Sequence, residues 1–439
     1  MVSASRTRSC RHSFGNMGLG VTTACLTMLN TSCPASADDG VPRSKFPTYA
    51  FVDLGTLPGY DHSKAFGINN AGEVVGLSTN DIDFGPNRAF IWRDGDMTDL
   101  GTLGGDGAAA VSVNDTSTVA GLGQIQPGLN APTHAFLWEG VVMDDLGTLG
   151  GSASWANHVT ASGLVVGGSR PEGDFTFHPV LWVNGIPEDL GLLPEHWLGD
   201  ARAMNTSGQI VGYSTTVFSE ARAVLWEKEP QDLGTLPGGC CSEAFDINDA
   251  GQIVGFSWFD GTSGFHAVLW ENKVAFDLGP LAEGHNSRAL AINARADVVG
   301  VAWITIDGPV VPRATLWQDE AAFDLNCLIP AGIGWSITEA RDINEAGQIV
   351  GFGINTETGV THGLLLKSST WSPGDFDGDG DVDLTDYAFL SDRLSTIGPA
   401  PDHNSFLGHL CAGAYDSDQD GDVDLRDFAA FQLAFTGAF

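Results

Sequence analysis

A repeat of about 45 residues constrains this chain more than any other feature of its sequence. Its most regular marker is an Asp-Leu pair that occurs seven times at spacings of 43 to 47 residues, with the aspartates at Asp53, Asp99, Asp145, Asp189, Asp232, Asp277 and Asp324. Between the markers comes an Ala-x-x-Ile-Asn-x-x-Gly-x-Val-Val-Gly segment, followed by a basic residue and an apolar run that usually ends in Trp. All these parts are clearest in residues 244–278. Seven copies at a near-constant period indicate one supersecondary unit repeated along the chain.

Each repeat predicts four short strands. In the first complete unit the expected strands are Ala65–Asn69, Glu73–Ser78, Arg88–Trp92 and Met97–Leu103. The first pair is joined by a tight turn containing Gly72, and the last pair by the Arg-Asp-Gly-Asp turn at residues 93–96. No helical period of 3.6 residues interrupts the pattern. Four strands in one repeat of this length are typical of a β-propeller blade.

The phase of the repeat predicts that the ring is closed. The first strand expected in the repeat region, Tyr49–Leu57, is a fourth strand with no first three strands before it. The last, His362–Leu366, is a third strand with no fourth strand after it. Seven whole blades therefore require the N-terminal strand to complete the C-terminal blade, which also removes an exposed sheet edge. We expect an all-β fold, a closed seven-bladed propeller over residues 48–367.

Two columns of residues recur in every repeat. The third strand opens with a basic residue in all seven units: Arg88, His134, His178, Arg222, His266, Arg313 and His362. The Asp of the Asp-Leu pair follows 10 or 11 residues later across a hairpin, and closure would place His362 opposite Asp53. Since a catalytic or metal site needs its groups once, we expect cross-strand pairs within each blade. A second column should pack between blades: Trp92, Trp138, Trp182, Trp226, Trp270, Trp317 and Leu366.

The first 37 residues are typical of a secretory signal peptide. Arg6, Arg8 and Arg11 precede a moderately apolar stretch, Met17–Leu29, and Ala-Ser-Ala at residues 35–37 fits a cleavage site. The apolar stretch is too short to span a bilayer as a helix. We therefore expect an exported protein without a membrane span, with residues 38–47 as a linker.

The charge of the remaining chain narrows the range of partners. Without residues 1–37, 17 Lys and Arg stand against 55 Asp and Glu, a formal charge of −38. Such a balance argues against nucleic acid and anionic membranes as ligands, because both require basic surface. Four cysteines remain, Cys240, Cys241, Cys327 and Cys411, which are too few for a disulfide scaffold. Their pairing stays open.

The repeat resembles a known family. The His-Ala-Phe-Leu-Trp run at residues 134–138 and Asp-Leu-Gly-Thr-Leu-Gly-Gly at 145–151 resemble the HAF repeat of bacterial extracellular repeat proteins. The resemblance covers about three quarters of the chain and implies secretion and a propeller-like structure, without an assigned chemistry. Two units depart from the pattern, since Thr160 replaces the turn Asn and Ala296 replaces the turn Gly.

Parts that differ between units are where we expect a ligand to bind. The connections from second to third strand and from fourth strand to the next blade should share one face, around the mouth of the central channel. Aromatic side chains in these loops could stack on sugar rings. We predict a ligand site among His62, His158, Glu195, His196, Trp197, Trp258, Glu283 and His285.

The last 65 residues predict two calcium sites. After a linker at residues 368–374, oxygen ligands recur at positions 1, 3, 5, 7, 9 and 12 of two loops, with Gly380 and Gly421 at position 6, as calcium loops require. Like charges 4 Å apart cost from about 1 kcal/mol in water to about 4 kcal/mol at intermediate dielectric, so a cation is needed. The predicted ligands are Asp375, Asp377, Asp379, Asp381, Asp383, Asp386, Asp416, Asp418, Asp420, Asp422, Asp424 and Asp427.

The same segment resembles a type I dockerin. Each loop is followed, not preceded, by a helix-like apolar stretch, Tyr387–Leu394 and Phe428–Phe435, and position 12 is Asp rather than Glu. The resemblance implies a small helical domain over residues 375–439, two bound Ca²⁺ ions and a cohesin-like partner. Positions 10 and 11, which help choose that partner in dockerins, are Leu384-Thr385 in one loop and Leu425-Arg426 in the other.

Two classes of function remain. One is a secreted, non-catalytic binding or scaffold protein, expected as a monomer, whose propeller binds a glycan or protein and whose calcium module docks to a partner. The alternative is a propeller enzyme that degrades polysaccharides, a hydrolase or lyase, since dockerins commonly accompany such enzymes. A glycosidase needs two carboxylates at a defined separation and in different environments. The conspicuous acids here belong to repeated columns or to the calcium loops, so the sequence favours binding and assigns no catalytic residue.

Overall fold

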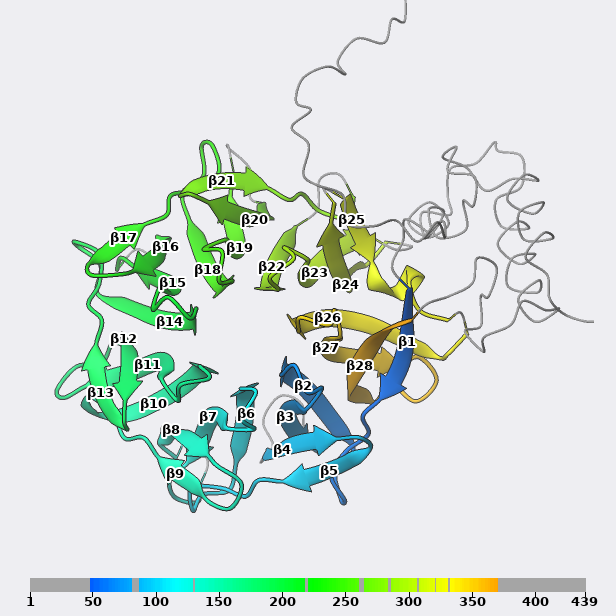
Figure 1. Cartoon of the computed structure of the whole chain (residues 1–439), viewed down its shortest axis with the longest axis horizontal. Helices are drawn as coiled ribbons and strands as arrows, with labels where there is room; N and C mark the ends of the chain where they lie inside the picture. Colours follow the sequence, from blue (N-terminus) through cyan, green and yellow to red (C-terminus); the bar gives the residue numbers. More distant parts are fainter. Residues whose placement is uncertain are drawn as a thin grey trace, which may run out of the picture. The chain divides into compact units, whose positions relative to one another are not determined.

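The computed structural model describes residues 48–369 except 81–86, 129–130, 218–219, 260–263, 283–285, 306–307, 320 and 331. The predicted signal peptide, both calcium loops and the dockerin-like domain lie outside the described residues. Within them, 28 strands form seven four-stranded antiparallel sheets arranged as blades around a central axis (Figure 1). The predicted all-β seven-bladed propeller is confirmed.

The blades follow the repeat in order, each from its inner to its outer strand. Blade 1 contains β2 (His62–Ile68), β3 (Val74–Thr79), β4 (Arg88–Arg93) and β5 (Asp96–Asp99), and blade 2 contains β6 (Ala108–Val113), β7 (Val119–Gln124), β8 (Thr133–Trp138) and β9 (Met143–Asp145). Blade 3 contains β10 (Gly150–Val159), β11 (Val165–Pro171), β12 (His178–Val183) and β13 (Ile186–Asp189). Blade 4 contains β14 (Leu198–Met204), β15 (Ile210–Thr215), β16 (Ala221–Trp226) and β17 (Pro230–Asp232).

Blade 5 contains β18 (Ser242–Ile247), β19 (Ile253–Trp258), β20 (Phe265–Glu271) and β21 (Val274–Asp277). Blade 6 contains β22 (Ser287–Ile292), β23 (Val298–Thr305), β24 (Val310–Gln318) and β25 (Ala321–Asp324), followed by the 3-10 turn η1 (Leu325–Cys327). Blade 7 contains β26 (Trp335–Ile343), β27 (Ile349–Asn355), β28 (Thr361–Ser369) and, as its outer strand, β1 (Thr48–Asp53).

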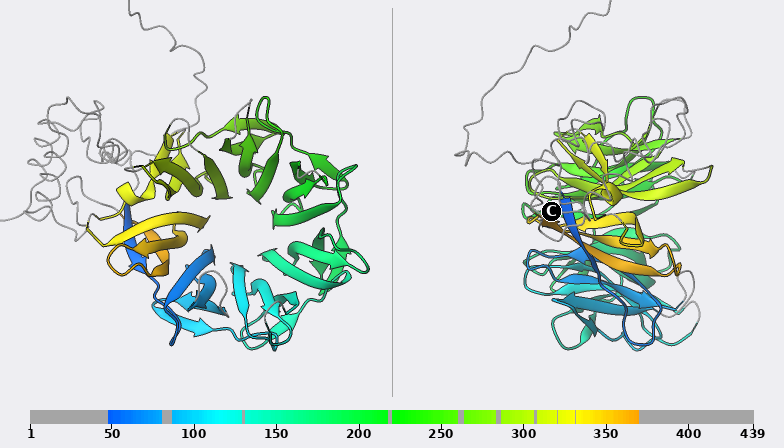
Figure 2. Two further views of the ribbon diagram at one scale, coloured as in Figure 1. Left: turned by 180° about the vertical axis from the view of Figure 1, so that it is seen from behind. Right: turned by 90° about the vertical axis from the view of Figure 1, so that its right-hand side faces the viewer.

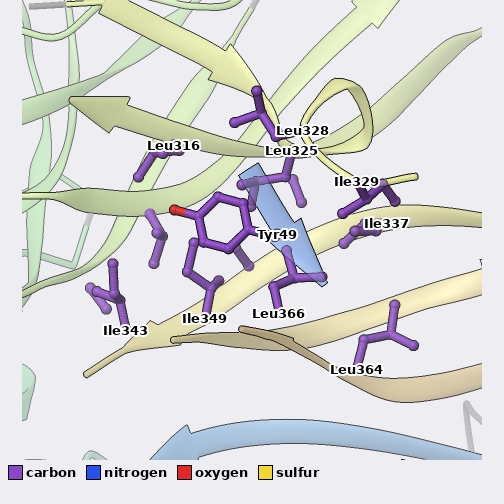
Figure 3. Close-up of a cluster of buried hydrophobic side chains, with 14 residues drawn as sticks. Tyr49, Leu316, Leu325, Leu328, Ile329, Ile337, Ile343, Ile349, Leu364 and Leu366 are labelled. Carbon is purple, nitrogen blue, oxygen red and sulfur yellow. The ribbon is translucent and has the colours of Figure 1, made fainter. Parts of the chain in front are cut away.

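Ring closure by the N-terminal strand is confirmed. β1 pairs antiparallel with β28 over six residue pairs, from Thr48 opposite Ser369 to Asp53 opposite Leu364. Both views of the ring place β1 beside β28 at the outer rim (Figures 1 and 2). Tyr49 anchors this strand, since its ring is only 4% exposed and packs among Leu316, Leu325 and Leu366 (Figure 3). The two ends of the repeat region therefore share one hydrophobic core.

The outer strands are shorter than predicted. The sequence suggested Met97–Leu103 and Tyr49–Leu57, whereas β5 ends at Asp99 and β1 ends at Asp53. At each end the aspartate carboxylate accepts a hydrogen bond from the main-chain N–H two residues later, at 2.8 Å in both cases. This Asx turn diverts the chain toward the next blade and ends the pairing.

A β-bulge in every inner strand explains the repeated Val-Val-Gly. The bulge pushes a main-chain carbonyl toward the second strand, where a Cβ on the facing glycine would lie 1.9–2.1 Å from that oxygen. The contact recurs in all seven blades, at Gly76, Gly121, Gly167, Gly212, Gly255, Gly300 and Gly351. Only glycine leaves room there.

The tryptophan column packs between blades, as predicted. All six rings are at most 6% exposed, and the seventh member, Leu366, is 2% exposed. Three indole N–H groups also donate to carbonyls of the turn that follows the preceding blade, Trp182 to Leu146, Trp226 to Gly191 and Trp317 to Gly279, at 2.9–3.1 Å. The repeat thus joins each blade to its neighbour by both packing and hydrogen bonds.

Candidate functional site

The column of basic residues is a structural feature of the blades. All seven predicted pairs form, with closest N–O distances of 2.7–3.4 Å, and His362 meets Asp53 across the ring closure at 2.8 Å. Burial alone would raise the pKa of Asp53, but hydrogen bonds from His362 and from the Gly55 N–H outweigh it and hold that pKa below its usual value. Each basic residue of this column therefore pairs with the aspartate on the neighbouring strand, which confirms the expected cross-strand pairs.

The inner strands surround a cavity of about 530 Å³. Its lining comes from all seven blades, so it occupies the central channel of the ring. Its volume falls within the range of ligand pockets, roughly 300–1,000 Å³. Each inner strand contributes a seven-residue inner segment, whose positions we number 1 to 7; the segments begin at Lys64, Ala109, Trp155, Asp200, Glu243, Arg288 and Glu339.

Two positions of the inner segment serve the fold. Position 2 is a fully buried alanine in every blade: Ala65, Ala110, Ala156, Ala201, Ala244, Ala289 and Ala340. Position 6 is asparagine in six blades, and its side-chain amide donates to the main-chain carbonyl at position 6 of the next blade at 2.9–3.4 Å. The bond from Asn344 to Asn69 carries this asparagine ring across the closure. Thr160, the seventh member, has no amide to donate.

Carboxylates at positions 4 and 7 hold neighbouring blades together. Asp246 accepts from the Ile292 N–H and Asp342 from the Ile68 N–H, each at 2.9 Å. Burial raises the pKa of Asp246 to about 7 and that of Asp342 to about 6. At position 7 three further acids accept main-chain N–H bonds from the adjacent blade: Asp115, Asp249 and Glu345. One end of the channel is therefore acidic, with its carboxylates already engaged.

Positions 1 and 3, toward the other end, differ from blade to blade and bring arginines to the cavity. Arg202 lies 3.2 Å from Asp200, and Arg341 lies 2.6 Å from Glu339. Arg288 and Trp303 line the same cavity. The two ends of the channel thus differ: carboxylates that accept main-chain N–H bonds lie at one end, and arginines together with acids of position 1 lie at the other.

Aromatic rings surround the arginines. The Arg288 guanidinium lies 4.8 Å from the ring centres of both Phe256 and Phe265 and 5.6 Å from that of Trp303. Arg202 lies 5.5 Å from Tyr213, and Arg341 lies 5.4 Å from Phe66. Cations over aromatic faces gain electrostatic stabilisation, which grows where water is excluded.

Two acids behind these arginines are shifted toward the neutral form. Burial raises the pKa of Asp200, against the opposing effect of Arg202 and hydrogen bonds from Asn157 and Trp155. Burial also raises the pKa of Glu243, against the charges of Arg202 and Arg288. No hydrogen bond or ion pair links the Glu243 carboxylate to another described residue.

The predicted loop residues are only partly brought together. The two loop sets do share one face: their main chains hydrogen-bond to each other, for example Trp197 N–H to Thr215 O and Trp258 N–H to Cys241 O. Glu195 is exposed, with a φ of 67°, and Trp197 is 49% exposed. Trp258 lies 5.7 Å from Phe265, the ring that contacts Arg288. Trp258 is therefore next to an aromatic ring of the arginine cluster, but it does not itself line the cavity.

Of the three predicted histidines in the described residues, His62 and His196 have structural environments, whereas His158 lines the central cavity. His62 begins β2, and its Nδ1 accepts from the Thr361 N–H at 3.0 Å; His196 Nδ1 lies 2.8 Å from the Ser214 hydroxyl. The prediction that His158 lies in a loop was wrong, because it belongs to β10, at position 4 of the inner segment. Burial lowers the pKa of His158 to about 4, and its Nδ1 has no hydrogen-bond partner. Glu283 and His285 lie outside the described residues.

Sequence reasoning missed the channel residues Arg202, Glu243, Arg288, Glu339 and Arg341. A signal for them was present, since the repeats agree at positions 2 and 6 but differ in charge and size at positions 1 and 3. Residues that the fold does not require in every blade are the ones free to serve a ligand. Aligning the seven inner segments therefore separates the two kinds of position.

Metal, disulfide and membrane features of the described part of the chain are few. Among residues 48–369, apart from the gaps given above, no group of three or more His, Cys, Asp or Glu is placed to hold a metal ion. Cys240 and Cys241 are both free, with Sγ atoms 2.8 Å apart. No helix in the part of the chain that the structure describes is long and apolar enough to cross a membrane.

Comparisons with known proteins agree on the fold alone. No protein-family model and no curated protein is significantly similar to this chain. Among solved structures, the β-propeller domain of the Trilobed protease from Pyrococcus furiosus aligns with a TM-score of 0.48 at 11% identity, over 72% of this chain and 100% of that chain. That propeller has an open velcro topology, whereas here β1 closes the ring.

Two further similar structures are enzymes. A gluconolactonase from Xanthomonas campestris aligns at 9% identity with a TM-score of 0.35, over 74% of this chain and 91% of that chain. A sialidase from Trypanosoma rangeli aligns at 8% identity with a TM-score of 0.33, over 81% of this chain and 60% of that chain. At these levels of similarity neither activity is transferred to this chain.

Proposed function

We propose that this protein is a secreted, non-catalytic binding protein whose propeller binds a saccharide in its central channel. In this proposal a C-terminal module, residues 375–439, binds two Ca²⁺ ions and docks to a cohesin-like partner. Support for export and for the calcium module comes from the sequence patterns described above. Support for the channel as the ligand site comes from the propeller itself.

One observation carries the channel assignment. The residues that recur in every repeat already interact within the propeller: the basic residues pair with their aspartates, the tryptophans pack between blades, and the asparagines hydrogen-bond from blade to blade around the ring. Polar side chains left over by these repeats converge on the cavity at the arginine end of the channel. Since no blade requires them, their chemistry is available to a ligand.

This chemistry suits a saccharide. Sugars offer hydroxyl groups that accept from guanidinium N–H groups and donate to carboxylates, and their apolar faces pack on aromatic rings. Arg341 and Glu339 supply the first kind of group, and Trp303 and Phe66 supply the second kind in the same cavity. Apolar and aromatic walls with a few placed polar groups are typical of small-molecule sites.

The test is a screen of the calcium-loaded full chain against a glycan array, followed by calorimetric titration of the glycans that bind. Trp303→Ala should weaken binding about tenfold or more, as truncation of a central aromatic contact does. Phe276→Ala is the matched control, because this ring is 48% exposed on the outer strand β21. If both variants bind every glycan of the wild type with equal affinity, the glycan site does not lie in the channel.

One observation favours the enzyme alternative. Glu243 is largely buried, its pKa is raised, and its carboxylate has no hydrogen-bond partner among the described residues, as expected of a general acid. The discriminating assay measures new reducing ends or unsaturated sugars after incubation with polysaccharides. Turnover that disappears in Glu243→Gln would make the protein a hydrolase or lyase; absence of turnover with retained binding supports the binding function.

A further inference from the structure

Arg288 differs from every other arginine in the described residues. The others each have an ion pair with Asp or Glu or a side-chain hydrogen bond: Arg88, Arg93, Arg170, Arg202, Arg222, Arg295, Arg313 and Arg341. Within the same part of the chain, Arg288 has neither, although Asp and Glu outnumber Lys and Arg 55 to 20 in the whole sequence. Among the arginines that the structure describes, the fold therefore leaves one guanidinium unpaired, in a chain rich in carboxylates.

The surroundings of Arg288 make this costly. Burial lowers its pKa, against the charges of Glu243 and Glu339, and its Nε is buried without a hydrogen-bond partner. A guanidinium has five N–H donors and no acceptor, and it stays protonated in proteins. The rings of Phe256, Phe265 and Trp303 stabilise the charge but accept no strong hydrogen bond. None of its guanidinium N–H groups donates a hydrogen bond to another described residue.

Arg288 is also not needed by its position in the repeat. Position 1 of the inner segment holds Ala109 in blade 2 and Trp155 in blade 3, and both blades have the same four-stranded sheet. Arg288 is thus unpaired, is not required by the blade and lies on the wall of a cavity of ligand size. A bound group that accepts its hydrogen bonds explains all three features.

From this geometry we infer that the saccharide bound in the channel carries a carboxylate, as uronic acid sugars do, and that Arg288 binds this carboxylate. The planar guanidinium fork matches a carboxylate through two parallel N–H···O bonds. Trp303 flanks the same guanidinium and lines the cavity, so it would pack on the sugar ring, and Phe265 lies behind it with ring centres 5.8 Å apart. This inference rests on the proposed saccharide function and narrows it to acidic sugars.

The overall charge does not oppose the inference. A strongly acidic protein repels anions at long range, but charges beyond about 10 Å are largely screened at 0.1 M ionic strength. Closer to the cavity, three arginines line the wall, and the acids beside two of them are already paired. Of these three arginines, Arg288 has no carboxylate at ion-pair distance among the described residues.

The experiment titrates the full chain with oligogalacturonate and oligoglucuronate, and with the methyl ester of each, which removes only the charge. We expect at least one acid to bind at least ten times more tightly than its ester. Arg288→Met should lose about 10- to 100-fold in affinity for that acid, the range for hydrogen bonds to a charged group. Arg288→Lys should recover only part of it, because lysine keeps the charge without the fork.

Arg222→Met is the control, since Arg222 belongs to the paired outer column and should leave affinity unchanged. Thermal unfolding checks that the Arg288 variants fold, as the alanine in blade 2 leads us to expect. Equal affinity for acid and ester, or unchanged affinity in Arg288→Met, overturns the inference. If the glycan array shows only neutral sugars, the inference fails while the channel function stands; if no saccharide binds at all, both fail.

Discussion

Replacing Tyr49 by alanine removes the side chain that anchors the closing strand to the rest of the ring. Tyr49 is 4% exposed within a cluster that joins blades 6 and 7, and its main-chain N–H donates to Leu328 O at 2.8 Å (Figure 3). The hydrogen bonds of β1 survive the substitution, because they involve only main chain. What is lost is packing between the first strand of the chain and a core built largely from residues 314–366.

The magnitude follows from the burial. Truncating a fully buried aromatic ring to alanine costs about 3–5 kcal/mol, through lost transfer free energy and the cavity left behind. In a domain of this size that corresponds to a fall in melting temperature of roughly 4–8 °C. Tyr49→Phe should cost far less, about 0.5–1.5 kcal/mol, since it removes only the hydroxyl.

Urea unfolding followed by tryptophan fluorescence measures the difference, because the tryptophan column lies between blades and reports on the whole ring. Phe276→Ala on the outer strand of blade 5 is the control and should cost less than about 1 kcal/mol, as it is half exposed. Deleting residues 47–58 should be more damaging than Tyr49→Ala and expose the edge of β28. If Tyr49→Ala unfolds at the same urea concentration as Phe276→Ala, closure by β1 does not stabilise the ring.

Three further predictions follow from other parts of the chain. Asn248→Ala should lower the free energy of unfolding by about 2–4 kcal/mol, because Asn248 accepts two main-chain N–H bonds and donates to Asn293 O. Thr160→Asn should raise the free energy of unfolding by about 0.5–1.5 kcal/mol, because it completes the asparagine ring. A lower urea midpoint for Thr160→Asn than for the wild type would contradict this. The pKa of Asp246 rises from 3.8 to about 7 on folding, so the folded state binds the proton more tightly and stability falls as pH rises from about 4 to 7, by at most about 4 kcal/mol. Asp246→Ser, which keeps an acceptor as Ser112 does for the Val159 N–H in blade 2, should lose that slope, so the urea midpoint of the variant should rise relative to that of the wild type between pH 5 and pH 8; a difference that stays constant with pH would contradict the assignment. Finally, Asp375→Ala with Asp386→Ala should leave one calcium-binding event in place of two by calorimetry, and two unchanged events would disprove the proposed ligands.

The architecture could be predicted from the sequence because a propeller is specified locally and repeatedly. Each blade is a self-contained meander, so the spacing of Asp-Leu pairs, the turn residues and the alternation of apolar side chains define it without reference to distant segments. The phase of the repeat then required the strand Tyr49–Leu57 to pair with the strand His362–Leu366, and Asp53 to face His362. Both expectations depended on counting strands rather than on knowing any long-range contact.

The ends of strands and the site needed the tertiary structure. Outer strands end at Asp99 and Asp53 because the aspartate carboxylate accepts a hydrogen bond from the main-chain N–H two residues later. The periodicity of apolar residues does not predict this end point. His158 was predicted in a turn between blades, whereas it lies in β10 and pairs with β11. Side-chain hydrogen bonds and pairing between strands therefore decided what the pattern left open.

The channel chemistry could not be deduced from sequence order, since its residues lie in seven segments about 45 residues apart. Some partners of an arginine come from a neighbouring blade: Arg288 of blade 6 contacts the rings of Phe256 and Phe265 in blade 5. Sequence by itself determined that seven blades form and close, because that information repeats in every unit. Only the fold decided which charge stays unpaired, because pairing depends on distances between side chains that the chain brings together once the ring has closed.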